Sequence, residues 1–477
     1  MKKLLTLVVI AFCAVKFSTA QNVGIGTTTP LEKLHVAGNI KADTLKPNVV
    51  KIIANAGNGK LLTSDAAGNA SWQEQNRTNN GGGVGFGSWG DCSMNGISEY
   101  NPVTDSTGAE RDGFRASVAM SGNFAIVGVP GVGIIRKGYA AIYQFNGSNW
   151  IQTQRLTDPG STSNDNFGNS VAMSGNFAIV GAATDTVGVN ANQGAAFIFQ
   201  FNGNSWVFMQ KITDPGGAAS DLFGFSVALS GNNAVVGSLV DDIGANTDQG
   251  SASVFHFNGN NWAFVQKLTY PTGAATDGFG SSIAVSDNFL LIGAFQDDIG
   301  ANLNQGSACF FKLNGNNWAF NKKVTDSTGN GDEDFGISVS LSNNFAVIGA
   351  PVSHVPVSST PGAAFAFRFN GNSWDVMDKL TDPFGSPQSL FGNSVSVSGN
   401  FLIVGDPFHG PSQVGSAVIY SRVGLQWQAL QNTKDPQARP SDKFGNAVTI
   451  DGASRRFLVG MPSYAQLSGK AIFGKIN

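Results

Sequence analysis

Residues 221–237 read Asp-Leu-Phe-Gly-Phe-Ser-Val-Ala-Leu-Ser-Gly-Asn-Asn-Ala-Val-Val-Gly, and this stretch decides the fold because it recurs. The Phe of its Phe-Gly pair returns in steps of 53, 56, 56, 56, 56 and 53 residues, at Phe114, Phe167, Phe223, Phe279, Phe335, Phe391 and Phe444, with Arg115 replacing the Gly in the first copy. Each copy has an apolar stretch, a short turn and a second apolar stretch that ends in Gly. This pattern predicts a pair of antiparallel strands in every repeat.

Two further strands complete each repeat. A third strand is expected over residues 194–201 and is followed by Asn202-Gly203, a pair that favours a tight hairpin turn. The fourth strand begins at a Trp, which recurs as Trp150, Trp206, Trp262, Trp318, Trp374 and Trp427. Both faces of the third strand are mostly apolar, as expected when a neighbouring sheet covers each side. The sequence therefore predicts an all-β fold, a seven-bladed β-propeller.

The seventh repeat lacks its Trp strand, and the missing piece lies before the first repeat. Val103-Thr-Asp-Ser-Thr-Gly108 has the same sequence as Val324-Thr-Asp-Ser-Thr-Gly329, which places Ile97 where the Trp should stand. We expect residues 96 to 103 to pair into the last blade and close the ring. Closure removes the open sheet edges that promote aggregation. The predicted propeller spans residues 96–477.

The N-terminus has the features of a secretory signal peptide over residues 1–20. Lys2 and Lys3 precede an apolar run over residues 4–15, and Ser18-Thr-Ala20 offers a small-residue cleavage site. The apolar run is short for a transmembrane span, and none longer follows. Cleavage leaves Cys92 and Cys309, too few for a disulfide framework. We expect a secreted or cell-surface protein.

Composition limits the partners. Charged residues make up 13% of the chain, the formal net charge is −3, and no basic block is present. Nucleic acid is therefore excluded as a partner, because phosphate contacts need clustered Lys and Arg.

The Phe-Gly pairs and the later Gly349-Ala-Pro351 resemble the FG-GAP repeat family, the propeller repeat of integrin α subunits and of many bacterial exported proteins. Gly250-Ser-Ala252 resembles the bacterial subtype. The resemblance implies a propeller that binds extracellular partners. Integrin-type repeats often carry an Asp-x-Asp-x-Asp-Gly calcium loop, which is shortened here to Ser121-Gly-Asn123 and its equivalents. The integrin calcium sites are therefore not carried over, and no cofactor is predicted.

Residues 21–75 resemble a different kind of structure. Val23-Gly-Ile-Gly-Thr-Thr-Thr-Pro30 and Lys33-Leu-His-Val36 are similar to stalk segments of phage tail fibres, which are commonly trimeric. The resemblance implies a short β-rich stalk and suggests a homotrimer. A Gly/Asn-rich linker over residues 76–95 separates this stalk from the propeller.

Three loops between the expected second and third strands are acidic and alike. Their ligand-face candidates are Asp185, Asp241, Asp242, Asp248, Asp297 and Asp298. In one interpretation they form a ligand face, with or without calcium; in the other, Asp only shapes turns, since it tolerates left-handed backbone. His354 and His409, in loops of adjacent blades, are a weaker metal candidate, and the metal content is left open.

No catalytic motif stands out, so an enzyme is not predicted. The first hypothesis is an exported surface module that presents a polar loop face to a protein or glycan, as an adhesin does. The alternatives are an enzyme that acts on extracellular polysaccharide through loop carboxylates and a structural envelope component without a ligand. The sequence does not decide the ligand, the mode of attachment or the oligomeric state.

Overall fold

The computed structural model describes residues 98–103, 117–130, 137–160, 165–352, 362–384, 389–410, 412–462 and 469–476, together with the backbone of four short earlier strands. The chain forms two compact units, residues 1–88 and 89–477. In the first unit, β1 (Val23–Ile25) pairs in parallel with β2 (Leu34–Val36), and β3 (Lys60–Ser64) pairs antiparallel with β4 (Ala70–Glu74). None of the described residues belongs to a helix long and apolar enough to cross a membrane.

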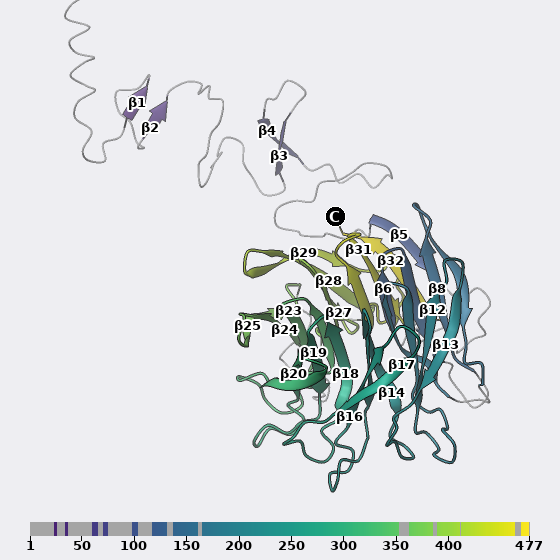
Figure 1. The fold of residues 1–477 in the computed structure, drawn as a ribbon. Coiled ribbons are helices and arrows are strands. Elements are labelled where there is room, and N and C mark those ends of the chain that lie inside the picture. Colours follow the sequence, from purple (N-terminus) through teal and green to yellow (C-terminus); the bar gives the residue numbers. More distant parts are fainter. Residues whose placement is uncertain are drawn as a thin grey trace, which may run out of the picture. The chain divides into compact units, whose positions relative to one another are not determined.

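The second unit consists of seven antiparallel sheets of four strands each, which are the blades of a propeller (Figure 1). Blade I contains β6 (Val118–Ser121), β7 (Phe124–Val129), β8 (Tyr139–Phe145) and β9 (Trp150–Leu156). Blade II contains β10 (Phe167–Ser174), β11 (Phe177–Ala182), β12 (Ala195–Phe201) and β13 (Trp206–Ile212). Blade III contains β14 (Phe223–Ser230), β15 (Asn233–Ser238), β16 (Ser251–Phe257) and β17 (Trp262–Leu268).

The remaining blades repeat this order. Blade IV contains β18 (Phe279–Ser286), β19 (Phe289–Ala294), β20 (Ser307–Asn314) and β21 (Asn317–Val324). Blade V contains β22 (Ser338–Ser342), β23 (Phe345–Ala350), β24 (Ala363–Phe369) and β25 (Trp374–Thr381). Blade VI contains β26 (Ser394–Ser398), β27 (Phe401–Asp406), β28 (Ser416–Val423) and β29 (Gln426–Thr433). Blade VII contains β30 (Ala447–Asp451), β31 (Arg456–Met461), β32 (Lys470–Lys475) and, as its outer strand, β5 (Ser98–Val103).

The N-terminal strand closes the ring, as the sequence predicts. β5 pairs antiparallel with β32, and Val103 lies opposite Ala471 (Figure 1). Tyr100 packs against the core of blade VII and donates a hydrogen bond of 2.9 Å to Asp435. The first described propeller strand is thereby joined to the last by backbone pairing, a side-chain hydrogen bond and apolar contact.

The Gly of each Phe-Gly pair is required by the distance between blades. Gly237, which stands near the end of the second strand of blade III, lies against the backbone of Gly280 in blade IV. A Cβ at Gly237 would stand 2.1 Å from the carbonyl oxygen of Gly280, and Gly280 itself has a φ of +93°. Only glycine fits such an approach and such a backbone angle without strain.

The Ser of the repeated motif joins neighbouring blades, and its Asp holds the link between them. Ser226 donates a 2.7 Å hydrogen bond to the carbonyl of Gly280, and the same bond recurs from Ser170, Ser282, Ser338 and Ser394 to the next blade. Asp221 accepts the backbone N–H of Ala218 at 2.6 Å, which fixes the segment that enters the blade. The motif recurs because its residues perform the same structural tasks at most blade boundaries.

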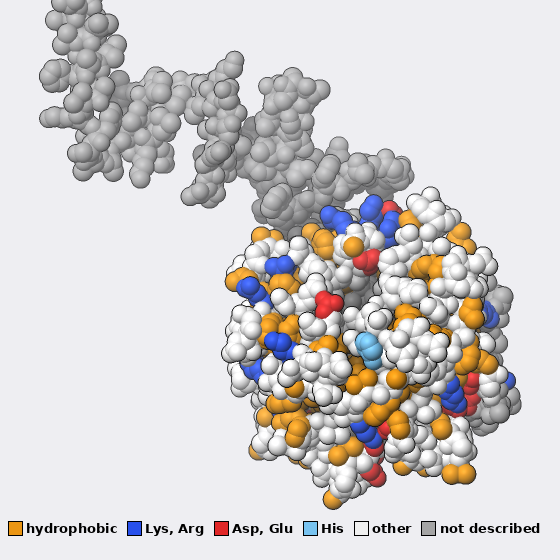
Figure 2. All heavy atoms as spheres, in the orientation of Figure 1, with side chains coloured by type: hydrophobic (Ala, Val, Ile, Leu, Met, Phe, Trp, Pro, Cys, Tyr) orange, Lys and Arg blue, Asp and Glu red, His pale blue; other side chains and the backbone are white. Residues whose placement is uncertain are grey.

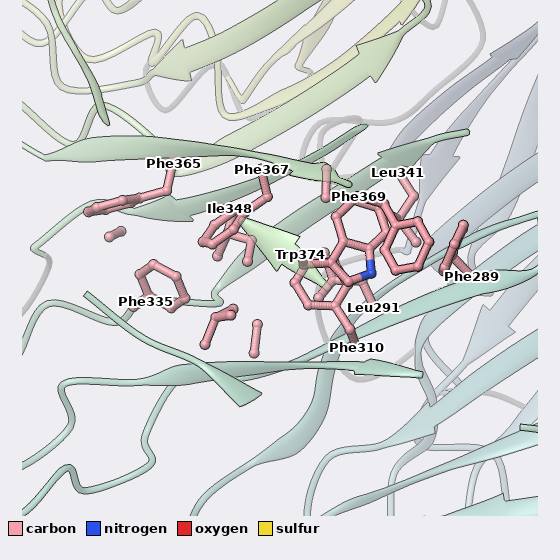
Figure 3. Packing of buried hydrophobic residues seen from close by; sticks show 14 of the residues in the cluster. Phe289, Leu291, Phe310, Phe335, Leu341, Ile348, Phe365, Phe367, Phe369 and Trp374 are labelled. Atoms are coloured by element: carbon pink, nitrogen blue, oxygen red, sulfur yellow. The ribbon is translucent and has the colours of Figure 1, made fainter. Parts of the chain in front are cut away.

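Aromatic rings fill the outer part of most blade boundaries. Between blades IV and V, Phe289 at the start of one second strand meets Phe369 and Trp374 of the next blade (Figure 3). The ring centroids lie 4.6 Å and 5.1 Å from that of Phe289. We call such a set a ring triad, and two more have the same form: Phe124, Phe201 and Trp206; Phe177, Phe257 and Trp262. Trp206, Trp262 and Trp374 of the repeated Trp series therefore pack between blades.

Candidate functional site

The long loops lie at one end of the blades. The loops between second and third strands and the links between one blade and the next emerge at this end, which we call the long-loop face. In blades II, III and IV the loop has one shape, because a two-residue bridge closes its tip in each case. These bridges join Val187 with Asn190, Ile243 with Asn246, and Ile299 with Asn302.

An Asn and a Gln hold each of these loops to the next link. In blade III, the Asn246 side-chain amide donates to Gln249 and to the carbonyl of Gly273, and Gln249 donates to the carbonyl of Tyr270. The same contacts recur from Asn190 and Gln193 and from Asn302 and Gln305. Each loop therefore bridges two blades and is fixed in place before any ligand arrives.

The first Asp of each loop points inward and forms an ion pair. Asp185, Asp241 and Asp297 are only 4–5% exposed. They contact the amines of Lys211, Lys267 and Lys323, which lie on the fourth strands. Lys267 also contacts Asp214 of the preceding link at 2.8 Å. These three acids therefore stabilise the base of each loop through buried ion pairs.

Burial and pairing shift the pKa values in this layer. Burial raises the pKa of the Asp277 carboxyl to about 6, although the N–H of Ala274 opposes the shift, and nearby Asp297 adds to it. Burial alone would lower the pKa of Lys267, but its bonds to Asp214 and Asp241 raise it above its ordinary value. Lys267 therefore remains charged at neutral pH and balances the carboxylates around it.

The remaining candidates face outward. Asp242 and Asp298 are exposed, and each accepts a backbone N–H six residues later, from Asp248 and Asn304, at 2.9 Å and 2.8 Å. Asp248 is partly exposed and has a φ of +55°. These acids shape turns, and they also leave carboxylate oxygens at the surface of a rigid loop.

Apolar side chains stand at two of the same loop tips. Val189 is 98% exposed and Leu303 is 63% exposed. On the face of the molecule shown in Figure 2, charged side chains are sparse, and hydrophobic side chains are scattered among uncharged polar side chains and backbone. Exposed apolar tips beside a few acids combine the two kinds of contact that interfaces use.

The six candidate acids do not meet at one point. Among the described residues, two groups of three have ligand atoms within 4.8 Å of one another: Asp158, Asp165 and Asp185; Asp382, Asp406 and His409. The first group surrounds the carboxylate that pairs with Lys211. Of the six candidates only Asp185 belongs to either group.

The second group lies in blade VI, where His409 replaces the first Asp of the loop. Its Nδ1 lies 3.0 Å from Asp382 and 3.4 Å from Asp406, and its Nε2 lies 3.0 Å from the amine of Lys434. Burial lowers the pKa of His409, but the hydrogen bonds to Asp382 and Asp406 outweigh this and raise it to about 9. The imidazolium thus acts as the cation that a lysine supplies elsewhere. His354 lies outside the described residues.

The profile of the FG-GAP repeat family matches residues 150–199, 206–255, 262–311, 318–367 and 374–420, which make up more than half of the chain. The protein belongs to the FG-GAP repeat family. No curated protein matches it. Each matched FG-GAP segment runs from the fourth strand of one blade to the third strand of the next. The sequence repeat is therefore offset from the blade by one strand, and the last blade has to obtain its fourth strand from β5.

FG-GAP propellers are binding or structural modules and are not typically catalytic. Two sets of residues in this propeller were not predicted from the sequence: the Asn and Gln that hold each long loop, which we call the loop clamps, and the lysines of the fourth strands. The clamps had a signal, since the loops of blades II to IV share the pattern Asn-x-x-Gln-Gly. The lysines had one as well, because each stands five residues after the repeated Trp of blades II to V.

Proposed function

We propose that the protein is an exported surface module that binds an extracellular protein or glycan through its long-loop face. The observation that carries the proposal is the set of three pre-organised loops in consecutive blades. Each is clamped by Asn and Gln and supported by a buried ion pair, and two of them expose an apolar tip. Loops on rigid scaffolds are the usual place for binding residues, and rigid loops lose little entropy on binding.

Other parts of the chain support the proposed export and multivalency. The signal-peptide features of residues 1–20 support secretion, and FG-GAP repeats are typical of extracellular proteins. The stalk over residues 21–75 would assemble a homotrimer, which would let weak single contacts add up to useful avidity. In this proposal calcium assists ligand binding at the surface acids Asp242, Asp248 and Asp298, and it is not required for folding.

The test is a binding screen of the full-length protein against extracellular matrix proteins and glycans, with and without calcium. We expect the variant with Asp242→Asn, Asp248→Asn and Asp298→Asn to bind its partner at least tenfold more weakly. Asp287→Asn is the matched control, because Asp287 is an exposed acid with positive φ at a short hairpin on the opposite face. Partner binding that survives neutralisation of the three acids, together with loss of both apolar tips (Val189→Ser and Leu303→Ser), would contradict the proposal.

A further inference from the structure

A pocket of about 480 Å³ lies on the outer rim, between blades III and IV. It is formed by the β16–β17 hairpin on one side and the β20–β21 hairpin on the other. Its lining includes Asn233, His256, Phe264, Leu313, Asn316 and Trp318. The volume falls within the range of small-molecule sites. This pocket is remote in the fold from the long loops, since both hairpins turn at the opposite end of the blades.

The pocket exists because a ring triad is incomplete. Asn233 begins β15, whereas the second strands of blades I, II, IV and V all begin with Phe. Leu313 lies opposite Trp318 in the β20–β21 ladder, in the place where Phe257 lies opposite Trp262. Two of the three rings that fill the space at other boundaries are therefore replaced by smaller side chains. The third ring, that of Trp318, is still present and buried, and it forms part of the pocket lining.

An aromatic ring is open to solvent at this site. Phe264 is 42% exposed and packs against Phe255, with ring centroids 5.7 Å apart and ring planes at 74°. This contact holds the ring in place, and its exposed part offers an apolar platform. Together with Leu313 and Val254, it gives the pocket an apolar side.

The pocket lining also includes hydrogen-bonding side chains, which are amides and one imidazole. His256 Nδ1 lies 2.9 Å from Asn233 Oδ1, an oxygen that accepts a hydrogen bond from the ring N–H, and Nε2 is the second polar atom of this ring. The amide of Asn316 adds a donor and an acceptor at the rim. Among the described residues that line the pocket, none is Asp, Glu, Lys or Arg. The site is therefore suited to a neutral ligand.

We propose that this pocket binds one ring of a neutral saccharide. A pyranose ring has an apolar C–H face, which stacks on an aromatic ring, and a rim of hydroxyls that both donate and accept hydrogen bonds. Phe264 provides the platform, and His256, Asn233 and Asn316 provide groups that pair with hydroxyls. The neutral lining disfavours sialylated, sulfated or phosphorylated ligands, because their charge would lose hydration without gaining a cationic partner. This site is independent of the long-loop face, and its ligand differs from any protein partner bound there.

The test uses an array of neutral, sialylated and sulfated oligosaccharides with the labelled full-length protein, followed by titration calorimetry with the best neutral binder. The decisive variant combines Asn233→Phe with Leu313→Phe. It restores the rings found at other boundaries, so we expect equal or higher thermal stability and at least a tenfold loss of saccharide affinity. Phe264→Ala should give a similar loss by removing the platform.

His256→Ala and Gln200→Ala form a matched pair. Gln200 occupies the position of His256 one blade earlier, where the ring triad is complete. We expect His256→Ala to weaken saccharide binding several-fold and Gln200→Ala to leave it unchanged. The triple variant of Asp242, Asp248 and Asp298 should also keep saccharide binding, so that failure at one site is distinguishable from failure at the other. Absence of neutral saccharide binding, a preference for acidic saccharides, or binding that survives the two added Phe rings would each overturn the proposal.

Discussion

Blades III and VI both neutralise buried carboxylates near their long loops, but they do so with different residues. In blade III, Lys267 of the fourth strand pairs with Asp214 of the preceding link and with Asp241 of the long loop. In blade VI, Asn432 stands at the lysine position and His409 stands at the loop position. There the charges are exchanged, because the imidazole comes from the loop and pairs with Asp382 of the link and with Asp406.

A second carboxylate, that of Asp221 in blade III, is also at a different sequence position in blade VI. Ser389 stands where Asp221 stands in blade III, two residues before the Phe-Gly pair. Its hydroxyl donates at 2.6 Å to Asp406, which occupies the place of Ser238. The comparison teaches that the balance of charge at a blade boundary is retained, whereas the residue that provides each charge varies.

Blade VII neutralises its buried carboxylate in a third way, which depends on the pairing of β5 with β32. Pro102 of β5 stands at the lysine position, and the cation is instead Lys470 of the third strand. Lys470 lies 2.8 Å from Asp435 and 2.9 Å from the hydroxyl of Tyr100. The N-terminal strand thus contributes a hydrogen bond to the buried pair in addition to its backbone ladder.

The largest expected effect comes from breaking this closure. Deletion of residues 91–105 removes β5 and leaves Asp435 and Lys470 without Tyr100. Lost burial of Tyr100 and Val103, together with the lost backbone ladder, should lower the free energy of unfolding by about 5 kcal/mol or more. Calorimetry on the full-length and deleted chains measures this change. Deletion of residues 21–75 is the control and should leave the melting temperature of the propeller unchanged; equal melting temperatures for all three chains would contradict the role of β5.

The next effect concerns the shared lysine of blade III. Lys267→Met keeps an apolar stem but leaves two buried carboxylates, Asp214 and Asp241, without their cation. Breaking a buried pair in this way costs about 3–5 kcal/mol. Lys379→Met is the matched comparison, because Lys379 contacts one carboxylate, Asp326, and its side chain is 45% exposed. Denaturant unfolding at pH 7 should therefore rank the Lys267 variant as clearly the less stable. Equal stabilities of the two variants would contradict the idea that a lysine shared by two carboxylates stabilises the fold more than a lysine paired with one.

The fold could be predicted from sequence because its determinants are local and repeated. The Phe-Gly pair, the Trp and the Asn-Gly turn recur in steps of 53 or 56 residues, and each lies at or near a strand end in the structure. Closure was also predictable, because residues 103–108 repeat residues 324–329. In these cases one residue type performs one task at the same position in most copies.

The candidate site was harder to predict because it depends on contacts between positions that vary. Asp185, Asp241 and Asp297 are easily recognised as a series, but their burial under lysines of the fourth strand is decided by packing across the blade. His409 and Asp406 depart from the repeat, and only their joint placement shows that one compensates for the other. The rim pocket is another case, since Asn233 and Leu313 lie 80 residues apart in the sequence.

The smallest of these effects distinguishes blade VI from the lysine blades through its pH dependence. The folded pKa of His409, about 9, exceeds its ordinary value of 6.5 because Asp382 and Asp406 face it, although Lys434 acts against them. A raised folded pKa means that the stabilisation is complete below pH 6.5 and is lost as pH rises through 9. The change amounts to about 3 kcal/mol.

The measurement is the free energy of unfolding between pH 6 and pH 10 for the wild type and His409→Gln. Glutamine cannot titrate, so the variant should be less stable at pH 6 and its deficit should shrink towards pH 10. His256→Gln is the matched control, because His256 is exposed and bonded to an amide, and it should leave the wild-type slope unchanged. A deficit that is the same at pH 6 and pH 10 would mean that His409 acts by packing alone. In that case the analogy between His409 and the lysines of the other blades would fail.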